Sequence, residues 1–273
     1  NVDLKDLANR LLTFDTEDVE NHVPLTAAEC LSVCHMAMEA MRSTDICIHI
    51  KTPINIVGDL HGQFHDLLRI FDALGQPPET FQWMPMCAII DGQIFCCHGG
   101  ISPNFMLQPF NLRGGQQANV QALNECKKPV EPVRPGILCD IMWSDPIGTA
   151  FSAQFSQSSE TLTEAKWLPN KRGCSFSFSG QALEEVMRLF QTQMLIRGHQ
   201  VAMNGYQSQL NRRCVTVFSA PGYCGVYNNI SSILQIERLN DDSKSPGSFF
   251  LLRPMQRDPS ALANLFWNEL RDI

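Results

Sequence analysis

The chain has 273 residues, 44% of them apolar, and a formal net charge of −7. That length and apolar content suffice for the core of one large domain. The acidic balance argues against a nucleic-acid partner, which calls for a basic face. No apolar run approaches the length of a membrane span, so we expect no membrane partner either.

Cysteine usage favours a reducing compartment. The chain has eleven cysteines, an odd number scattered without paired spacing. Several lie inside apolar runs, namely Cys87, Cys96, Cys97 and Cys139. Buried, reduced thiols of this kind are typical of proteins of the cytoplasm or nucleus, or both.

The first clear helix signal is a capping box formed by Thr26 and Glu29, three residues apart. Apolar residues then recur at helical spacing, at Leu31, Cys34, Met38 and Met41. This stripe predicts a helix that packs into the core through its methionine-bearing face.

A strand, a glycine-framed turn and a helix follow in order. The apolar run Ile54–Val57 predicts the strand, and Gly58-Asp59-Leu60-His61-Gly62 interrupts it. An amphipathic segment from Asp66 to Leu74 predicts the helix, which Gly75 ends. The turn therefore lies at the carboxyl end of a strand, where α/β proteins place their ligands.

Two more apolar runs form a predicted hairpin around Asp91-Gly92 and end at His98-Gly99-Gly100. A predicted helix, 181–191, leads to the strand 194–196, which ends at Arg197-Gly198-His199. The strand 215–218 leads into a loop with Tyr223. The polar stretch 148–168 predicts a loop, and Asp258-Pro259 opens a final amphipathic helix.

The strand ends carry potential metal ligands. Asp59 and His61 are two positions apart, so in an extended segment their side chains point to the same side and can bind one metal ion. His98 and His199 end two other strands beside glycines, which allow close backbone approach. Carboxylate and imidazole ligands together suit Mn, Fe or Zn better than Ca or Mg. A lone strand-end histidine is usually structural, but several converging strand ends suggest a two-metal hydrolase.

Six motifs in a fixed order support a more specific interpretation. They are Pro53–Gln63, Ile94–Pro103, Cys139–Pro146, Lys171–Gly173, Arg197–Gln200 and Phe218–Gly225. With them the chain resembles the metallo-dependent serine/threonine protein phosphatases, the family of the type-one and type-two-A phosphatases and calcineurin. The resemblance spans roughly residues 5–253. Cys224-Gly225 after Tyr223 is closest to the type-one branch, whereas Val226–Asn229 is similar to calcineurin, so the subfamily stays open.

The resemblance implies an α/β fold of two mixed β-sheets packed as a sandwich and flanked by helices. It places the catalytic domain at residues 1–256 and a helical extension at 257–273. It also implies hydrolysis of phosphoserine and phosphothreonine in proteins, by a hydroxide that two divalent metal ions activate. Manganese is the favoured metal, with iron or zinc as alternatives, and regulatory or targeting subunits are expected partners.

Residue roles follow from the same resemblance. Asp59 and His61 would bind the first metal, and His98 and His199 the second. Arg172 would hold the substrate phosphate through its bidentate fork. Tyr223 would border the cleft, and Asp145 would orient groups near the metals.

Two family motifs are missing between Thr80 and Phe81. They would supply a bridging aspartate, a second phosphate-binding arginine, an asparagine ligand and the histidine that acts as general acid. Either the natural protein has these residues and the sequence omits them, or the protein truly lacks them. We favour the omission, because a deletion would remove strands and helices from the middle of a core whose stability margin is only about 5–15 kcal/mol.

Two other functions remain open. A true deletion would make the protein a pseudophosphatase that serves as a scaffold or interaction subunit. A related metallophosphoesterase that acts on nucleotides would share the Gly-Asp-x-His-Gly motif. Two smaller departures also mark a divergent member: Gly198 replaces the family's alanine, and Gly222 replaces its asparagine.

Overall fold

The structure is a computed structural model that describes residues 2–12, 25–75, 85–107, 110, 114–126, 134–148, 165–237 and 247–255. The expected helix at 257–273 and most of the polar stretch 148–168 lie outside these residues. The proposed boundary at residue 256 therefore stays a prediction. Within the described part of the chain, no helix combines the length and apolarity needed to cross a membrane.

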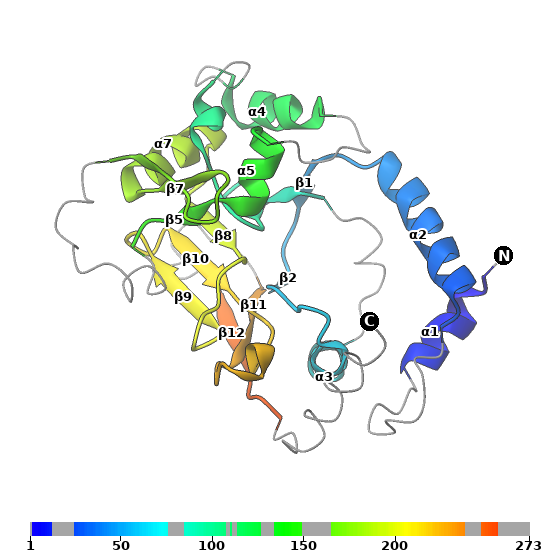
Figure 1. The fold of residues 1–273 in the computed structure, drawn as a ribbon. Helices are drawn as coiled ribbons and strands as arrows, with labels where there is room; N and C mark the ends of the chain where they lie inside the picture. Colours follow the sequence, from blue (N-terminus) through cyan, green and yellow to red (C-terminus); the bar gives the residue numbers. More distant parts are fainter. Residues whose placement is uncertain are drawn as a thin grey trace.

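A six-stranded mixed sheet forms the centre of the molecule (Figure 1). In spatial order its strands are β1 (Cys47–Ile50), β3 (Cys87–Ile90), β4 (Ile94–Cys97), β8 (Met194–Arg197), β10 (Cys214–Val217) and β9 (Tyr206–Gln209). The strands β4, β8 and β10 run parallel to one another, while β3 and β9 pair antiparallel with their neighbours β4 and β10. The carboxyl ends of β4, β8 and β10 therefore meet at one edge of the sheet.

A second, three-stranded sheet packs on one face of the first. Its strands are β12 (Ser248–Leu252), β11 (Ser231–Ile236) and β2 (Ile54–Val57), and both described pairings are antiparallel. Leu234 and Ile236 of this sheet share an apolar cluster with Ile196 and Val217 of the large sheet. The predicted sandwich is confirmed. A third, small sheet of β5 (Asp145–Pro146), β7 (Phe176–Phe178) and β6 (Trp167–Pro169) was not foreseen.

Helices cover the opposite face of the large sheet. They are α4 (Gly115–Asn124), α5 (Ile137–Trp143) and α7 (Gly180–Phe190). The helix α7 forms as the sequence predicts: the Ser179 hydroxyl caps it, and its apolar residues recur on one side and are buried. Phe190 of α7 stacks on Phe95 of β4 with ring centroids 5.2 Å apart, which anchors the helix on the sheet.

The predicted helix after Thr26 is confirmed, but its packing was predicted wrongly. It is α2 (Ala27–Arg42), it follows α1 (Leu4–Leu12), and its capping box is formed as expected. No residue of α2 is buried, and Leu31 and Met38 keep 62% and 51% of their surface exposed. Figure 1 shows α1 and α2 at one side of the molecule, away from the sheets.

The remaining helices lie next to the strand ends. The helix α3 (Phe64–Leu74) follows the Gly-Asp-x-His-Gly turn and ends at Gly75, whose φ of 87° is reserved largely for glycine. Two short 3₁₀ helices are η1 (Pro103–Met106) and η2 (Tyr223–Gly225). All eleven cysteines are free, and Cys87, Cys97 and Cys139 are buried as predicted while Cys96 is half-buried.

Candidate active site

The end of β2 is tied to the edge where the parallel strands end. Asp59 forms an isolated parallel bridge with Phe218, just beyond β10. The Ser219 hydroxyl accepts a hydrogen bond from the Gly58 N–H at 2.8 Å. A Cβ on Gly58 would lie 2.1 Å from the Val217 carbonyl oxygen, so only glycine allows this approach. The two sheets thus present their strand ends to one site.

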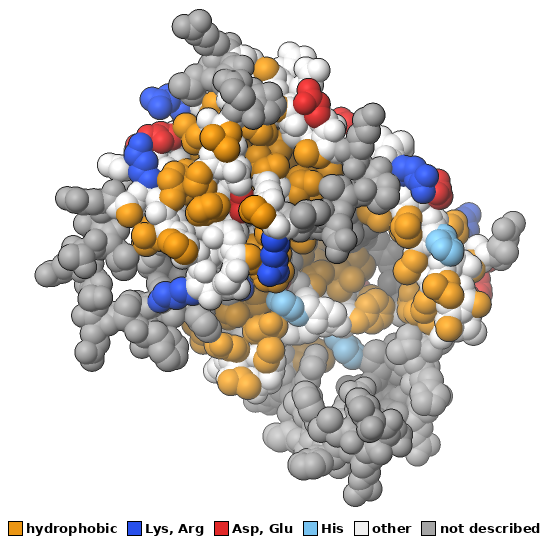
Figure 2. All heavy atoms as spheres, turned by 45° about the horizontal axis from the view of Figure 1, so that its top comes forward, with side chains coloured by type: hydrophobic (Ala, Val, Ile, Leu, Met, Phe, Trp, Pro, Cys, Tyr) orange, Lys and Arg blue, Asp and Glu red, His pale blue; other side chains and the backbone are white. Residues whose placement is uncertain are grey.

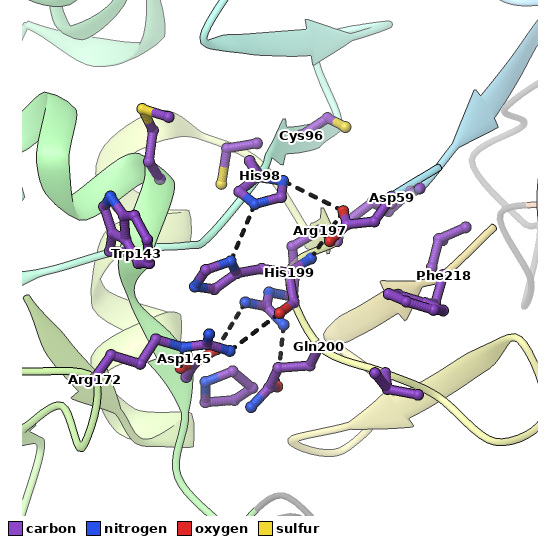
Figure 3. Close-up of a pocket in the computed structure, with 18 of the residues that line it drawn as sticks. Asp59, Cys96, His98, Trp143, Asp145, Arg172, Arg197, His199, Gln200 and Phe218 are labelled. Atoms are coloured by element: carbon purple, nitrogen blue, oxygen red, sulfur yellow. Dashed lines mark hydrogen bonds and ion pairs between the residues drawn. The ribbon is translucent and has the colours of Figure 1, made fainter. Parts of the chain in front are cut away.

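Four predicted metal ligands come together there (Figure 3). Asp59 Oδ2 lies 3.5 Å from His61 Nε2, and Asp59 Oδ1 lies 3.4 Å from His98 Nδ1. His98 Nε2 and His199 Nδ1 share a hydrogen bond of 3.0 Å. The backbone N–H of His199 also donates to Asp59 Oδ1 at 3.2 Å. The four side chains form one connected group.

Two of these histidines have unusual backbone conformations. His61 has a φ of 49° and His199 a φ of 69°, in the left-handed region that non-glycine residues rarely adopt. Such strain persists only where the surrounding structure enforces it, and it clusters at functional sites. The conformations aim both imidazoles at the same site.

The electrostatic environment keeps the deeper histidines neutral. Burial, together with the positive charges of Arg197 and Arg172, lowers the pKa of His199 to about 3. Burial also lowers the pKa of His98, although the nearby Asp59 partly opposes it. A neutral imidazole has a lone pair to offer, so both residues are in the form that binds metal.

Two observations fit these residues to divalent metal ions: the chemistry of their donor atoms and one buried nitrogen that lacks a hydrogen-bond partner. His199 Nε2 is buried and has no hydrogen-bond partner among the described residues, as a ligand atom awaiting an ion would. Among those same residues, however, no three His, Cys, Asp or Glu side chains already surround a common point. The donors contact one another in pairs instead. The division into a first pair, Asp59 and His61, and a second pair, His98 and His199, stays a prediction.

Arg172 and Asp145 lie beside the histidines. Arg172 Nε donates to Asp145 Oδ2 at 2.7 Å, and its Nη2 donates to the His199 carbonyl at 3.0 Å. Burial alone would raise the pKa of Asp145, but Arg197 and Arg172 outweigh it and lower that pKa. Asp145 is therefore an ionised carboxylate that contacts arginines and none of the four predicted metal ligands directly.

Tyr223 borders the site, and three residues to which the sequence assigned no role join it, namely Phe218, Trp143 and Arg197. The Tyr223 ring lies against His61 with centroids 4.6 Å apart, and Phe218 supports both rings. Trp143 meets His199 edge-on at 5.4 Å. Arg197 is fully buried behind His199. Each of them lies inside one of the six sequence motifs, in Cys139–Pro146, Arg197–Gln200 or Phe218–Gly225, and this position was the signal available in the sequence.

A hollow of about 1490 Å³ opens onto this group. It is lined by all seven predicted site residues and by apolar sheet residues, among them Ile56, Cys87 and Ala88. Figure 2 shows hydrophobic side chains around the hollow and histidine side chains at its centre. Small-molecule pockets usually measure roughly 300–1,000 Å³, so this hollow exceeds what a phosphate group requires.

Comparison with known proteins finds one family match. Residues 74–203 match the profile of the calcineurin-like phosphoesterase family. This stretch of the chain is therefore similar to calcineurin-like phosphoesterases. The matched stretch includes His98, Asp145, Arg172 and His199, whereas Asp59, His61 and Tyr223 lie outside it.

The fold of the chain is also seen in a solved structure. It is described as a protein serine/threonine phosphatase from Saccharomyces cerevisiae with similarity to human phosphatase PP5. The superposition covers 86% of this chain and 92% of that one, with a TM-score of 0.66 and 15% sequence identity. The predicted resemblance to the metallophosphoesterases and the predicted fold are confirmed.

One edge of the three-stranded sheet is open in the part of the chain that the structure describes. The strand β2 pairs with β11 on one side, through Val57 and Ile233 among others, and no described strand pairs with its other side. Ile56 and Val57 of β2 also line the hollow. The motifs expected between Thr80 and Phe81 would lie between α3 and β3 along the chain.

Proposed function

We propose that the chain hydrolyses phosphoserine and phosphothreonine in proteins. The observation that carries the proposal is the convergence of one carboxylate, three imidazoles and Arg172 on a single hollow in a chain similar to phosphoesterases. Metal-dependent hydrolysis of phosphoesters uses divalent metal ions and a cation for the phosphate oxygens, and these side chains have the chemistry for both roles.

Asp59, His61, His98 and His199 would hold the metal ions. When bound, divalent ions supply Lewis-acid stabilisation of the phosphoryl group and activation of water. Manganese, iron or zinc would suit these mixed oxygen and nitrogen donors. Arg172 would bind the phosphate oxygens, and its contacts with Asp145 and the His199 carbonyl fix the direction of its guanidinium. Tyr223, packed on His61, would form the wall that the leaving alcohol passes.

Substrate proteins and regulatory subunits are the partners that this proposal implies. Turnover of a phosphothreonine peptide with added Mn²⁺, compared with turnover of a dinucleotide, tests the substrate class. Preference for the peptide would support the proposal, whereas preference for the dinucleotide would assign the domain to nucleotide substrates.

A second candidate is a pseudophosphatase that acts as a scaffold. The open edge of β2 and the size of the hollow favour it, because both are surfaces that a partner could cover. The intact mass of the protein from its natural source separates the two candidates. A mass well above 30.6 kDa, with the additional residues located between Thr80 and Phe81 by peptide mapping, would favour the phosphatase. A mass equal to 30.6 kDa would favour the scaffold.

A further inference from the structure

Arg197 is a buried cation at the end of β8, one residue before Gly198 and two before His199. Its side chain has no exposed surface. Its guanidinium donates to the Gly99 carbonyl at 2.6 Å, the Gln200 side chain at 3.0 Å, the Ser144 carbonyl at 3.1 Å and Asp145 Oδ1 at 2.9 Å. Burying such a group is costly unless its donors are satisfied, and here every one of its nitrogens has a partner.

The acceptors of Arg197 belong to three segments that carry site residues. Gly99 follows His98, Gln200 follows His199, and Ser144 precedes Asp145. One planar guanidinium therefore holds these three segments in a fixed relation. A lysine could not do the same, because its ammonium lacks the rigid fork of donors.

Asp145 links Arg197 to Arg172 through its two carboxylate oxygens. Its Oδ1 accepts from Arg197, and its Oδ2 accepts from Arg172 Nε at 2.7 Å and from the Asn170 side chain at 3.1 Å. Arg172 is one-third exposed, whereas Arg197 is not exposed at all. The chain Arg197–Asp145–Arg172 thus connects a fixed interior cation with one that faces the hollow.

We infer that Arg197 and Asp145 are positioning residues that orient Arg172 for a phosphate group. Arg197 holds the Asp145 carboxylate in one orientation, and that carboxylate together with the His199 carbonyl fixes the Arg172 guanidinium at two points. This inference rests on the proposed function, since it assigns Arg172 to the phosphate. Under this inference, Asp145 orients an arginine and does not orient a metal ligand.

A double-mutant cycle tests the inference through the binding of inorganic phosphate to the Mn²⁺-loaded protein, measured by calorimetry. Asp145→Asn and Arg197→Lys should each weaken phosphate binding about tenfold, because Arg172 loses its alignment. In an Arg172→Ala background the same changes should cost less than about twofold, because the group they orient is gone. The matched control Asp91→Asn alters a carboxylate in the β3–β4 turn, outside the hollow, and should bind phosphate like the wild type.

The outcomes separate the possibilities. Full, additive losses in the Arg172→Ala background, or unchanged binding in both single variants, would overturn the inference while leaving the proposed function intact. A wild-type protein that neither binds phosphate nor hydrolyses a phosphopeptide would overturn the proposed function and the inference with it. If Arg197→Lys unfolds, the cycle is completed with Asp145→Asn, which keeps one oxygen acceptor for the arginines.

Discussion

Asp59 Oδ1 accepts a hydrogen bond of 3.2 Å from the backbone N–H of His199, across a sequence separation of 140 residues. The contact is possible because the residue before His199 is glycine. A Cβ on Gly198 would lie 2.5 Å from Asp59 Oδ1 and 3.6 Å from His98 Nδ1. The glycine that replaces the family's alanine thus makes room for the carboxylate in its observed position.

Gly198→Ala should therefore displace Asp59 and weaken Mn²⁺ binding. We expect a loss of roughly tenfold, the lower end of what changes around metal ligands cost. Calorimetric titration with Mn²⁺ measures it, and Gly180→Ala, at the start of α7 with open space around it, is the control. Unchanged Mn²⁺ affinity in Gly198→Ala would show that Asp59 has room to adjust.

The backbone conformation of a second glycine, Gly222, leads to a prediction about the stability of the fold. Gly222 has a φ of 58° and a ψ of 41°, a left-handed conformation that glycine and asparagine tolerate better than other residues. The family's asparagine at this position follows the same physical rule. Gly222→Asn should leave the free energy of unfolding nearly unchanged, whereas Gly222→Val should lower it by about 1–2 kcal/mol. Urea unfolding of the two variants compares them directly, and equal stability would contradict the backbone argument.

Metal binding should stabilise the folded chain. A ligand that binds only the folded state at 100 times its dissociation constant adds about 2.7 kcal/mol, or roughly 5–10 °C in Tm for a domain of this size. We expect Mn²⁺ to raise the Tm, EDTA to reverse the rise, and His199→Ala to reduce it. An equal rise in His199→Ala would place the metal elsewhere.

The junction of α1 and α2 should respond to acid. The backbone N–H of Thr26, and after it the Arg10 guanidinium, lower the pKa of Glu29 from 4.5 to about 2. Because the folded pKa is depressed, the stabilisation is present above pH 4.5 and is lost as the pH falls towards 2. Hydrogen exchange in α2 should be slower in the wild type than in Glu29→Gln at pH 6, and the difference should vanish near pH 2. A difference independent of pH would contradict this account.

The sequence predicted those parts of the site that depend on local signals. Asp59, His61, His98 and His199 each follow an apolar run beside glycine, and the parallel arrangement of strands brought these ends together. The role of Arg197 was not predictable, because its four partners come from three separate segments. The methionine stripe of α2 failed as a prediction for a related reason. Helical spacing defines a face, but only the tertiary structure decides whether another element covers it.

The central claim is that Asp59 and His61 belong to a metal-dependent phosphatase site. Its most direct test is the Mn²⁺-dependent release of phosphate from a phosphothreonine peptide by the wild type, His61→Ala and the control His49→Ala. His49 lies exposed on β1 and does not line the hollow. We predict that the wild type and His49→Ala turn the peptide over, and that His61→Ala stays folded but inactive. Turnover by His61→Ala at the wild-type rate would contradict the assignment of this site.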